Sequence, residues 1–297
     1  MRFDLVQGIA LQLCCRFALA TILSVAAIGA AAAADASASV WTESTNSQAR
    51  LVSGTVVHGG EPALMAGVQL RMKPGWKTYW RNPGDSGVPP HFDWTGSKNL
   101  RHAEVLYPAP HRFADAGGTA IGYEGEIVFP VKLVPERENE PIKLKLAFEY
   151  GLCKDLCIPN DVGLELTLSE KVGKGDAALI ETFLARVPKP AAPGILPEVK
   201  SVQANLHGEI PELVIEAAFA ANSRQTDLFI DAGDVFVPVP KPLGPPADGT
   251  QRFGVSFASE SEANALRGKV LTLTLVSDRG STETEWTADA ARLGHNQ

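Results

Sequence analysis

The sequence predicts an all-β protein in which an antiparallel β-sandwich is followed by a short helix and linker and then by a second, smaller β-sandwich. Two observations predict this fold. Most regular segments alternate apolar with polar residues and are rich in β-branched and aromatic residues, which is typical of strands with one buried face. Stretches rich in glycine and proline lie between them, as at residues 81–90 and 115–118, and are typical of turns.

The first 34 residues have the pattern of a secretory signal peptide. Arg2 and Arg16 precede an apolar stretch at residues 17–29, and an alanine run with an Ala-x-Ala cleavage pattern follows it. An uncleaved membrane anchor is the alternative, but the apolar stretch is shorter than the ~20 residues of a spanning helix. Cys14 and Cys15 precede the apolar stretch and are expected to leave with the signal peptide. The mature chain is therefore expected in an oxidising compartment and is not expected to span a membrane.

Charge and composition argue against several classes of function. Without residues 1–34, the 27 basic and 34 acidic side chains become 25 and 33, which gives a net charge of −8. This acidic balance argues against a nucleic-acid partner. The sequence has no glycine-rich phosphate loop after a strand, no nucleophilic-serine motif and no paired-carboxylate signature. We therefore expect no bound cofactor.

The first sandwich is expected at residues 40–172. Five segments in it fit strands with one buried face, namely residues 49–57, 66–72, 125–134, 142–150 and 163–169.

A short helix and a proline-rich linker are expected at residues 173–194. The helix is predicted over residues 176–187, with Asp176 as its N-cap and an apolar face formed by Leu179, Ile180, Phe183 and Leu184. Residues 188–193 fit an extended linker. The second sandwich is expected at residues 195–297, with strands at residues 213–219, 228–231, 235–239, 252–257 and 270–276.

Cys153 and Cys157 are the cysteines that remain after removal of the signal peptide, and their spacing is the main clue to function. A fully extended segment would hold their Cα atoms about 13 Å apart, whereas a disulfide needs roughly 4.4–6.8 Å. The backbone must therefore turn between them, and Gly151 and Pro159 bracket such a turn. If residues 154–156 form a three-residue hairpin loop, the cysteines become a facing cross-strand pair that can open with little backbone movement.

Loop size argues that this pair is redox-active rather than a structural staple. A five-residue ring removes unfolded-state entropy worth about 2 kcal/mol, against about 4 kcal/mol for a ring of about fifty residues. Lys154 beside Cys153 favours its thiolate, the species that attacks a partner disulfide, whereas Asp155 opposes this effect. These two charges leave the direction of the net effect open.

Several motifs in one order carry a resemblance to a known family. They occupy residues 75–87, 107–110, 122–126, 129–131 and 150–159. Together they resemble the N-terminal periplasmic domain of the DsbD/ScsB family of thiol:disulfide interchange proteins. The resemblance is strong from residue 49 to residue 170. The helix and the second sandwich resemble the longer ScsB-type members more loosely.

The resemblance implies an immunoglobulin-like sandwich in the periplasm. In that family, the cysteine pair receives electrons from a membrane-embedded domain, by way of a thioredoxin-like domain, and reduces periplasmic partners. Cys153 and Cys157 match the redox pair. By the same resemblance, Cys157 forms the mixed disulfide with partners and Cys153 resolves it.

The resemblance also implies which residues support the pair. Tyr79 matches an aromatic position near it, and residues 113–123 fall where the family has a cap loop that shields the disulfide from other thiols. The expected supporting and cap residues are Tyr79, Phe113, Ile121, Tyr123 and Tyr150.

The chain departs from the family in two ways. The best-known member has a longer spacing between its cysteines than the three residues of this chain. The sequence also lacks the transmembrane and thioredoxin-like parts, so its electron donor is expected to be a separate protein. The expected partners are a membrane-embedded DsbD/ScsB/CcdA-like donor and thioredoxin-like periplasmic proteins.

Three interpretations of the function therefore compete. The first is a thiol:disulfide exchange protein similar to a protein-disulfide reductase, and the second is a non-enzymatic binding module with a structural disulfide. The redox potential separates these two. The third is a Cu(I)-binding or copper-tolerance protein, because two thiolates suit Cu(I). No metal ligand is assigned, since no close ligand spacing in sequence occurs among the histidines considered, which are His58, His91, His102 and His111.

Overall fold

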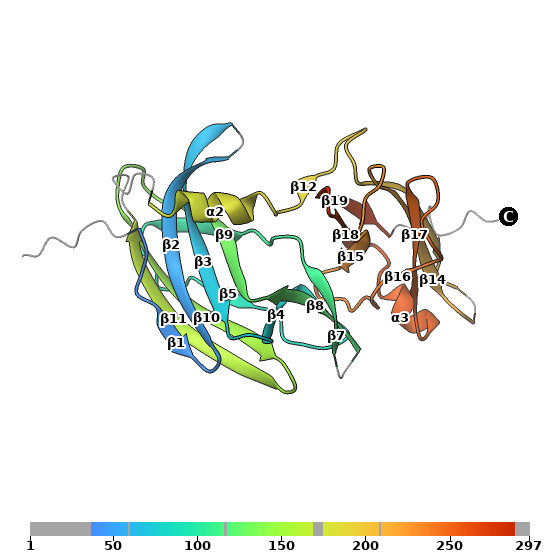
Figure 1. Cartoon of the computed structure of the whole chain (residues 1–297), viewed down its shortest axis with the longest axis horizontal. Helices are drawn as coiled ribbons and strands as arrows, with labels where there is room; N and C mark the ends of the chain where they lie inside the picture. The colour runs from blue at the N-terminus through green and yellow to red at the C-terminus, as the bar shows by residue number, and fades with distance from the viewer. Residues whose placement is uncertain (1–36, 59, 116–117, 169–174, 208, 289–297) are drawn as a thin grey trace, which may run out of the picture. The chain divides into compact units, whose positions relative to one another are not determined.

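The computed structural model describes residues 37–58, 60–115, 118–168, 175–207 and 209–288 (Figure 1). The expected signal peptide lies outside these residues. The described residues belong to one compact unit and are mostly β-strand, with two short helices among them, which confirms the all-β class. Neither of these two helices is long and apolar enough to cross a membrane.

The first sandwich packs a five-stranded sheet against a six-stranded sheet. The five-stranded sheet has the order β1 (Thr42–Ser44), β2 (Ser47–His58), β3 (Glu61–Met72), β9 (Glu126–Pro135) and β6 (Leu100–Val105). The other sheet has the order β11 (Cys157–Leu168), β10 (Ile142–Cys153), β4 (Lys77–Gly84), β8 (Gly118–Glu124) and β7 (His111–Asp115), with β5 (His91–Asp93) paired to β10. All five strands predicted for this sandwich overlap observed strands.

Alternation along β10 sets the two faces of the six-stranded sheet. Every second residue from Ile142 to Tyr150 is buried, and the residues between them are exposed. The buried face meets the five-stranded sheet in an aromatic core, where the Phe129 ring contacts those of Phe92, Tyr107, Tyr123 and Phe148. The opposite, outer face of the sheet carries the cysteine pair, because Cys153 lies an odd number of residues from Tyr150.

Helix α2 (Ala177–Leu184) lies on β2, β3 and β9 and completes the core of the first sandwich (Figure 1). Ala177, Ile180 and Phe183 are buried there. Gly54 of β2 allows the close approach, since a Cβ atom at Gly54 would lie 2.6 Å from the Ala177 nitrogen. The helix ends three residues earlier than predicted.

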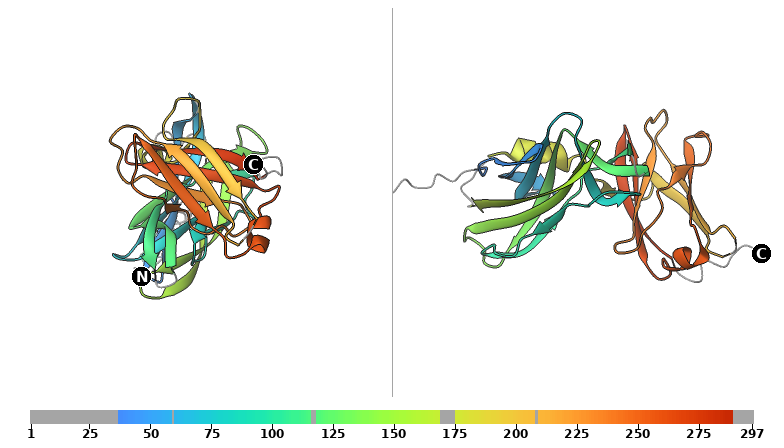
Figure 2. Two further views of the ribbon diagram at one scale, coloured as in Figure 1. Left: turned by 90° about the vertical axis from the view of Figure 1, so that its right-hand side faces the viewer. Right: turned by 90° about the horizontal axis from the view of Figure 1, so that it is seen from below.

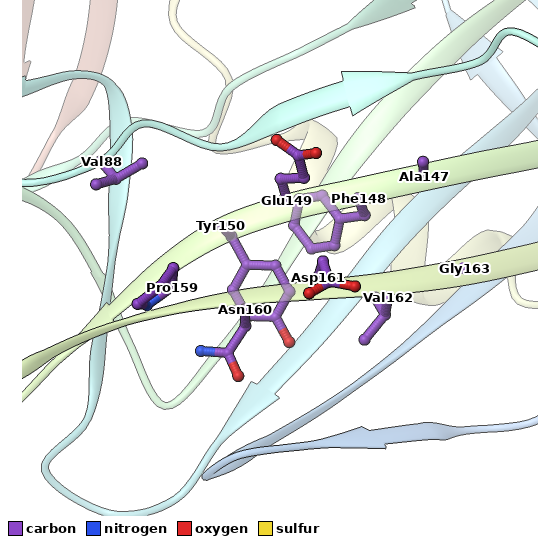
Figure 3. Close-up of a pocket in the computed structure, with 10 residues that line it drawn as sticks. All are labelled: Val88, Ala147, Phe148, Glu149, Tyr150, Pro159, Asn160, Asp161, Val162 and Gly163. Carbon is purple, nitrogen blue, oxygen red and sulfur yellow. The ribbon is translucent and has the colours of Figure 1, made fainter.

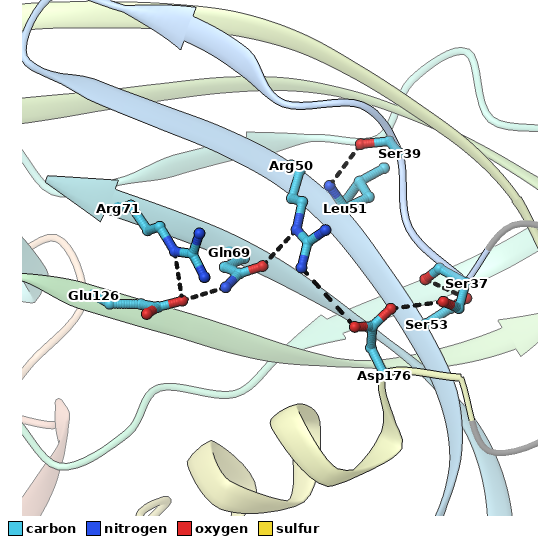
Figure 4. Close-up of polar contacts among 9 residues, drawn as sticks. All are labelled: Ser37, Ser39, Arg50, Leu51, Ser53, Gln69, Arg71, Glu126 and Asp176. Atoms are coloured by element: carbon cyan, nitrogen blue, oxygen red, sulfur yellow. Dashed lines mark hydrogen bonds and ion pairs between the residues drawn. The ribbon is translucent and has the colours of Figure 1, made fainter.

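Asp176 occupies the predicted N-cap position of α2, but its side chain makes no capping hydrogen bond. Its carboxylate instead accepts a 2.7 Å hydrogen bond from the Ser37 hydroxyl and lies 3.9 Å from the Arg50 guanidinium (Figure 4). The predicted N-cap position is confirmed, since the Asp176 carbonyl oxygen accepts from the Ile180 N–H, but the side chain does not cap the helix. Contacts with residues distant in sequence have taken the place of the local bond.

The second sandwich consists of two four-stranded sheets (Figure 2). One has the order β12 (Lys189–Pro190), β19 (Gly280–Thr287), β18 (Val270–Ser277) and β15 (Asp227–Asp231). The other has the order β13 (Glu198–Asn205), β14 (Glu212–Ala218), β17 (Thr250–Ser256) and β16 (Lys241–Pro242), and helix α3 spans Glu260–Asn264.

Two expectations for this region need correction. Residues 235–239 form no strand, although Val237 and Val239 are buried. Pro238 and Pro240 lack the N–H groups that a ladder requires, so the apolar residues are buried without strand pairing. Part of the expected linker pairs in parallel with β19 as β12, so it is tied into the sheet. The other four predicted strands overlap β14, β15, β17 and β18.

Two arginines of the six-stranded sheet bind strands of the second sandwich. Arg112 of β7 donates from Nε to Oδ2 of Asp227 at 2.9 Å. Arg81 follows Trp80 in an irregular part of β4, and its guanidinium lies 2.9 Å from Asp231 and 2.6 Å from Glu283. The two arginine side chains are 24% and 22% exposed, so these charges are partly removed from water. Strands β4 and β7 are thereby held by ion pairs to the second sandwich.

Candidate functional site

The cysteine pair closes a hairpin at the end of the six-stranded sheet. Strand β10 ends at Cys153 and β11 begins at Cys157, and the two residues are directly opposed. They form a disulfide with a Cα–Cα distance of 4.2 Å across a loop of residues 154–156. The predicted three-residue loop and facing pair are confirmed. Gly151 and Pro159 lie opposite each other within the paired strands, so they stand outside the loop.

The two sulfur-bearing residues differ in exposure. Cys153 is 4% exposed and packs with Tyr79 and Ala120, whereas Cys157 is exposed. The loop between them is exposed as well, and the Leu156 side chain is 71% exposed. A protein or small thiol coming from solvent therefore meets Cys157 first.

Tyr79 contacts the exposed sulfur. Its hydroxyl oxygen lies 3.2 Å from Sγ of Cys157. The ring lies between two glycines, since a Cβ atom at Gly87 would come within 2.2 Å of it and one at Gly151 within 3.0 Å. Gly87 also has a φ of +121°, which other residues rarely adopt. These glycines make room for the aromatic ring beside the disulfide.

Lys77 lies next to the buried sulfur on the same outer face. It is the register partner of Cys153 on one side and of Glu124 on the other. Its Nζ atom lies 3.9 Å from Oε1 of Glu124 and 4.8 Å from the centre of the Phe113 ring. Sequence reasoning assigned no role to Lys77 or Gly87. The pairing of β4 with β10, which brings Lys77 to Cys153, follows from no local pattern.

The expected cap residues lie on two different faces. Phe113 is half-buried and faces Ala120, which packs with Tyr79 and Cys153, so it belongs to the outer face. Ile121 and Tyr123 point into the core of the first sandwich. The Tyr123 hydroxyl donates to the Pro108 carbonyl oxygen at 2.7 Å, and burial raises the pKa of this hydroxyl well above its usual value.

Ile121 and Tyr123 therefore support the hairpin of β7 and β8 from its core side and do not cover the disulfide on the outer face. Their side chains face the core because alternate residues of a strand point to opposite faces of the sheet. Residues 116 and 117 of the expected cap lie outside the described part of the chain. Tyr150 is also a core residue, since its hydroxyl shares a 2.8 Å hydrogen bond with that of Ser47 and its ring stacks on Phe148. Burial raises its pKa.

A cavity of about 380 Å³ runs along β10 and β11, the two strands that carry the cysteines, although neither cysteine lines it (Figure 3). Pro159, two residues after Cys157, lies at one end with Val88, which is 53% exposed. The carboxylates of Glu149 and Asp161 lie along its length. The cavity places apolar and acidic groups within reach of a molecule bound at Cys157.

The copper interpretation gains no ligand cluster from the described residues. Among them, no group of three or more His, Cys, Asp or Glu side chains gathers in a way that could hold a metal ion. His91, His102 and His111 lie on β5, β6 and β7, and the side chain of His58 lies outside what the structure describes.

Comparison with known proteins places the cysteine pair in a recognised segment. Residues 58–169 match the family described as thiol:disulfide interchange protein DsbD, N-terminal. No curated protein sequence matches the chain. The fold is similar to the crystal structure of the N-terminal periplasmic domain of ScsB from Proteus mirabilis, with a TM-score of 0.66 and 20% identity over 86% of this chain and 99% of that one. This likeness shows the shared fold, and the matched segment contains all the expected site residues.

Proposed function

We propose that the chain, whose residues 58–169 belong to the DsbD N-terminal family of thiol:disulfide interchange proteins, exchanges electrons with partner proteins through Cys153 and Cys157. The observation that carries this proposal is the unequal exposure of the two cysteines. Cys157 is exposed and Cys153 is 4% exposed. Exchange begins with attack of a thiolate on one sulfur of a disulfide, and only an accessible sulfur can be attacked.

Reduction of the pair then proceeds in two balanced steps. A partner thiolate attacks Sγ of Cys157, the Cys153–Cys157 bond breaks, and its electron pair leaves with Cys153 as a thiolate. A mixed disulfide now joins the partner to Cys157. The second thiolate of the partner attacks the partner's own sulfur in this bond and displaces Cys157, so the partner leaves oxidised. Delivery of electrons to an oxidised partner reverses these steps, with Cys157 as nucleophile and Cys153 as resolving residue.

The surface around Cys157 supports a protein as the reaction partner. Leu156, which precedes Cys157 in the loop, and Val88, which lies near Gly151, are exposed apolar side chains, and a partner that covers them gains binding energy from their burial. The partners in this proposal are a membrane-embedded DsbD/ScsB/CcdA-like electron donor and thioredoxin-like periplasmic proteins, which pass electrons to the cysteine pair or receive them from it. The expected signal peptide and the likeness to a periplasmic domain support the periplasm as the location.

Trapping experiments test the proposal directly. Cys153→Ala should accumulate a covalent complex with a thioredoxin-like partner, because the mixed disulfide at Cys157 then lacks its resolving residue. Cys157→Ala should form little complex, because its remaining sulfur is buried. The variant that lacks both cysteines is the control for non-covalent capture. Mass spectrometry after thiol alkylation measures each product.

The wild-type protein supplies the decisive comparison with a structural disulfide. An excess of a reduced thioredoxin-like donor should reduce the pair in the folded protein. If the bond survives this treatment under native conditions and yields only after denaturation, the exchange function is excluded and the disulfide is structural.

A further inference from the structure

We propose that Lys77 stabilises the Cys153 thiolate that forms when a partner attacks Cys157. The inference rests on the proposed exchange function and assigns it a further residue. Lys77 of β4 is the register partner of Cys153 on β10. Directly opposed residues of an antiparallel pair point to the same face with Cβ atoms about 5 Å apart. The lysine stem therefore starts beside the buried sulfur.

Cys153 needs a nearby cation because it is the leaving group in a poorly hydrated position. It is 4% exposed and is covered by Tyr79 and Ala120. A negative charge placed there loses most of its hydration, which is costly unless a cation or a hydrogen-bond donor compensates. The Tyr79 hydroxyl contacts the other sulfur, that of Cys157. Lys77 is the cation that the strand register places beside Cys153.

The ammonium group of Lys77 is held loosely while the disulfide is intact. Its 3.9 Å contact with Glu124 is long for an ion pair, and the Glu124 side chain is 56% exposed, so water weakens the attraction. Its other contact is the face of the Phe113 ring. Glu124 and Cys153 flank Lys77 on opposite sides. Rotation about the flexible stem can therefore carry the ammonium from the carboxylate to the new thiolate.

The hairpin loop offers a competing cation. Lys154 follows Cys153 directly in sequence, with Asp155 beside it, but both side chains are exposed. Water and salt screen exposed charges, and the two charges oppose each other. The 27% exposed Lys77 side chain is better shielded from water, so its charge acts more strongly on a neighbouring anion.

Four variants test this assignment through the thiol–disulfide equilibrium with glutathione. Lys77→Gln should shift the equilibrium about tenfold toward the disulfide, which corresponds to about 30 mV for a two-electron couple. Lys77→Arg should keep the wild-type value, because the positive charge remains. Glu124→Gln should shift the equilibrium toward the dithiol, because it releases the ammonium for Cys153. Lys154→Gln is the matched control and should change the equilibrium by less than about twofold.

The redox potential of the cysteine pair depends on the relative stability of the disulfide and dithiol forms. A substitution that destabilises both forms equally therefore leaves this potential unchanged. Thermal unfolding of each variant in both forms checks this point. A wild-type equilibrium in Lys77→Gln would overturn the assignment, as would a larger effect from Lys154→Gln than from Lys77→Gln.

The proposed function and this inference fail in different ways. If the wild-type pair exchanges with a thioredoxin-like donor while Lys77→Gln keeps the wild-type equilibrium, the inference falls and the function stands. If the pair does not exchange with the donor but the glutathione equilibrium shifts as expected in Lys77→Gln and Glu124→Gln, the function falls and the role of Lys77 stands.

Discussion

The hydroxyl of Tyr79 donates a hydrogen bond to Sγ of Cys157 across 3.2 Å, because a disulfide sulfur carries no proton to donate. The same donor is in place when Cys157 becomes a thiolate, either as nucleophile or as leaving group of a mixed disulfide. A hydrogen bond to a charged group is worth about 1.5–3 kcal/mol, more than one to a neutral group. Tyr79 therefore favours the reactive form of the exposed cysteine.

Tyr79→Phe should lower the reactivity of Cys157. Loss of the donor should destabilise the Cys157 thiolate and slow its exchange with a partner disulfide about tenfold at neutral pH. The rate of alkylation as a function of pH in a Cys153→Ala background measures how much thiolate is present. Tyr150→Phe is the matched control, since its hydroxyl also makes a buried hydrogen bond, to Ser47, but contacts no sulfur.

Comparison of Tyr79→Phe with Tyr150→Phe separates an effect on the reactivity of Cys157 from an effect on the stability of the fold. Both should lose about 1 kcal/mol of unfolding free energy with the hydrogen bond, and only Tyr79→Phe should change alkylation. Equal alkylation profiles in the two variants would show that the Tyr79 hydroxyl acts only through the fold.

The hairpin that carries the cysteines could be predicted because residues close together in the sequence determine it. Few backbone paths are compatible with three residues between the cysteines, with the short Cα–Cα distance that a disulfide requires and with the alternating residues of β10. The long strands β2, β3, β9 and β11 were predicted for the same reason, since each alternates or stays apolar over many residues. These features depend on residues that are close in sequence.

The surroundings of the cysteines could not be predicted because they depend on pairing between distant strands. Strand β8 contains Gly118 and Gly122, which locally favour a turn. Gly122 is needed because a Cβ atom there would lie 1.9 Å from the Thr78 carbonyl oxygen of β4. Gly151 was taken as a turn residue, yet its lack of a side chain makes room for the Tyr79 ring. The requirement for glycine at these positions follows from the placement of β4 between β8 and β10, which no local sequence pattern predicts.

Phe113→Ala should speed reduction of the disulfide by a small thiol severalfold. The Phe113 ring contacts the Lys77 ammonium on the outer face and is the register partner of Ala120, which packs with Cys153, so we expect its loss to open a path to the pair. The rate of reduction by dithiothreitol under native conditions measures the effect. Phe236→Ala removes a 55% exposed ring from the second sandwich and serves as control. An unchanged rate in a folded Phe113→Ala protein would mean that this hairpin does not gate the disulfide.

Leu156→Asp should weaken reaction with protein partners while sparing reaction with small thiols. The side chain is 71% exposed in the loop between the cysteines, so the folded protein loses little from the change. A partner that buries this leucine loses its apolar contact and must instead desolvate a carboxylate. We expect the rate of mixed-disulfide formation with a thioredoxin-like protein to fall about tenfold.

Asp155→Asn is a suitable comparison for the leucine variant, because it changes the charge at the neighbouring exposed position without removing apolar surface. Equal partner rates in Leu156→Asp and the wild-type protein would place the partner contact elsewhere on the surface. A matching loss of rate with small thiols would instead show that the substitution has altered the disulfide itself.

The ion pair between Arg112 and Asp227 should stabilise the edge strand β7 from the second sandwich. Arg112 directly precedes Phe113, and its guanidinium also donates to the Pro240 carbonyl oxygen at 2.8 Å. Both charged side chains are 24% or less exposed, so removing one partner leaves the other poorly hydrated. Arg112→Asp and Asp227→Arg should each lower the free energy of unfolding by about 3 kcal/mol.

The exchanged pair, Arg112→Asp with Asp227→Arg, should recover part of this loss, since opposite charges again face each other. Denaturant unfolding measures stability, and dithiothreitol reduction measures access to the disulfide in the same samples. Because β7 carries Phe113, the disulfide of each single variant should also be reduced faster than that of the wild-type protein. The reduction rate of the exchanged pair should lie between the rates of the single variants and the wild-type rate. Loss of stability without faster reduction would mean that the second sandwich supports only the fold, whereas a change in both would show that it also limits access to the disulfide.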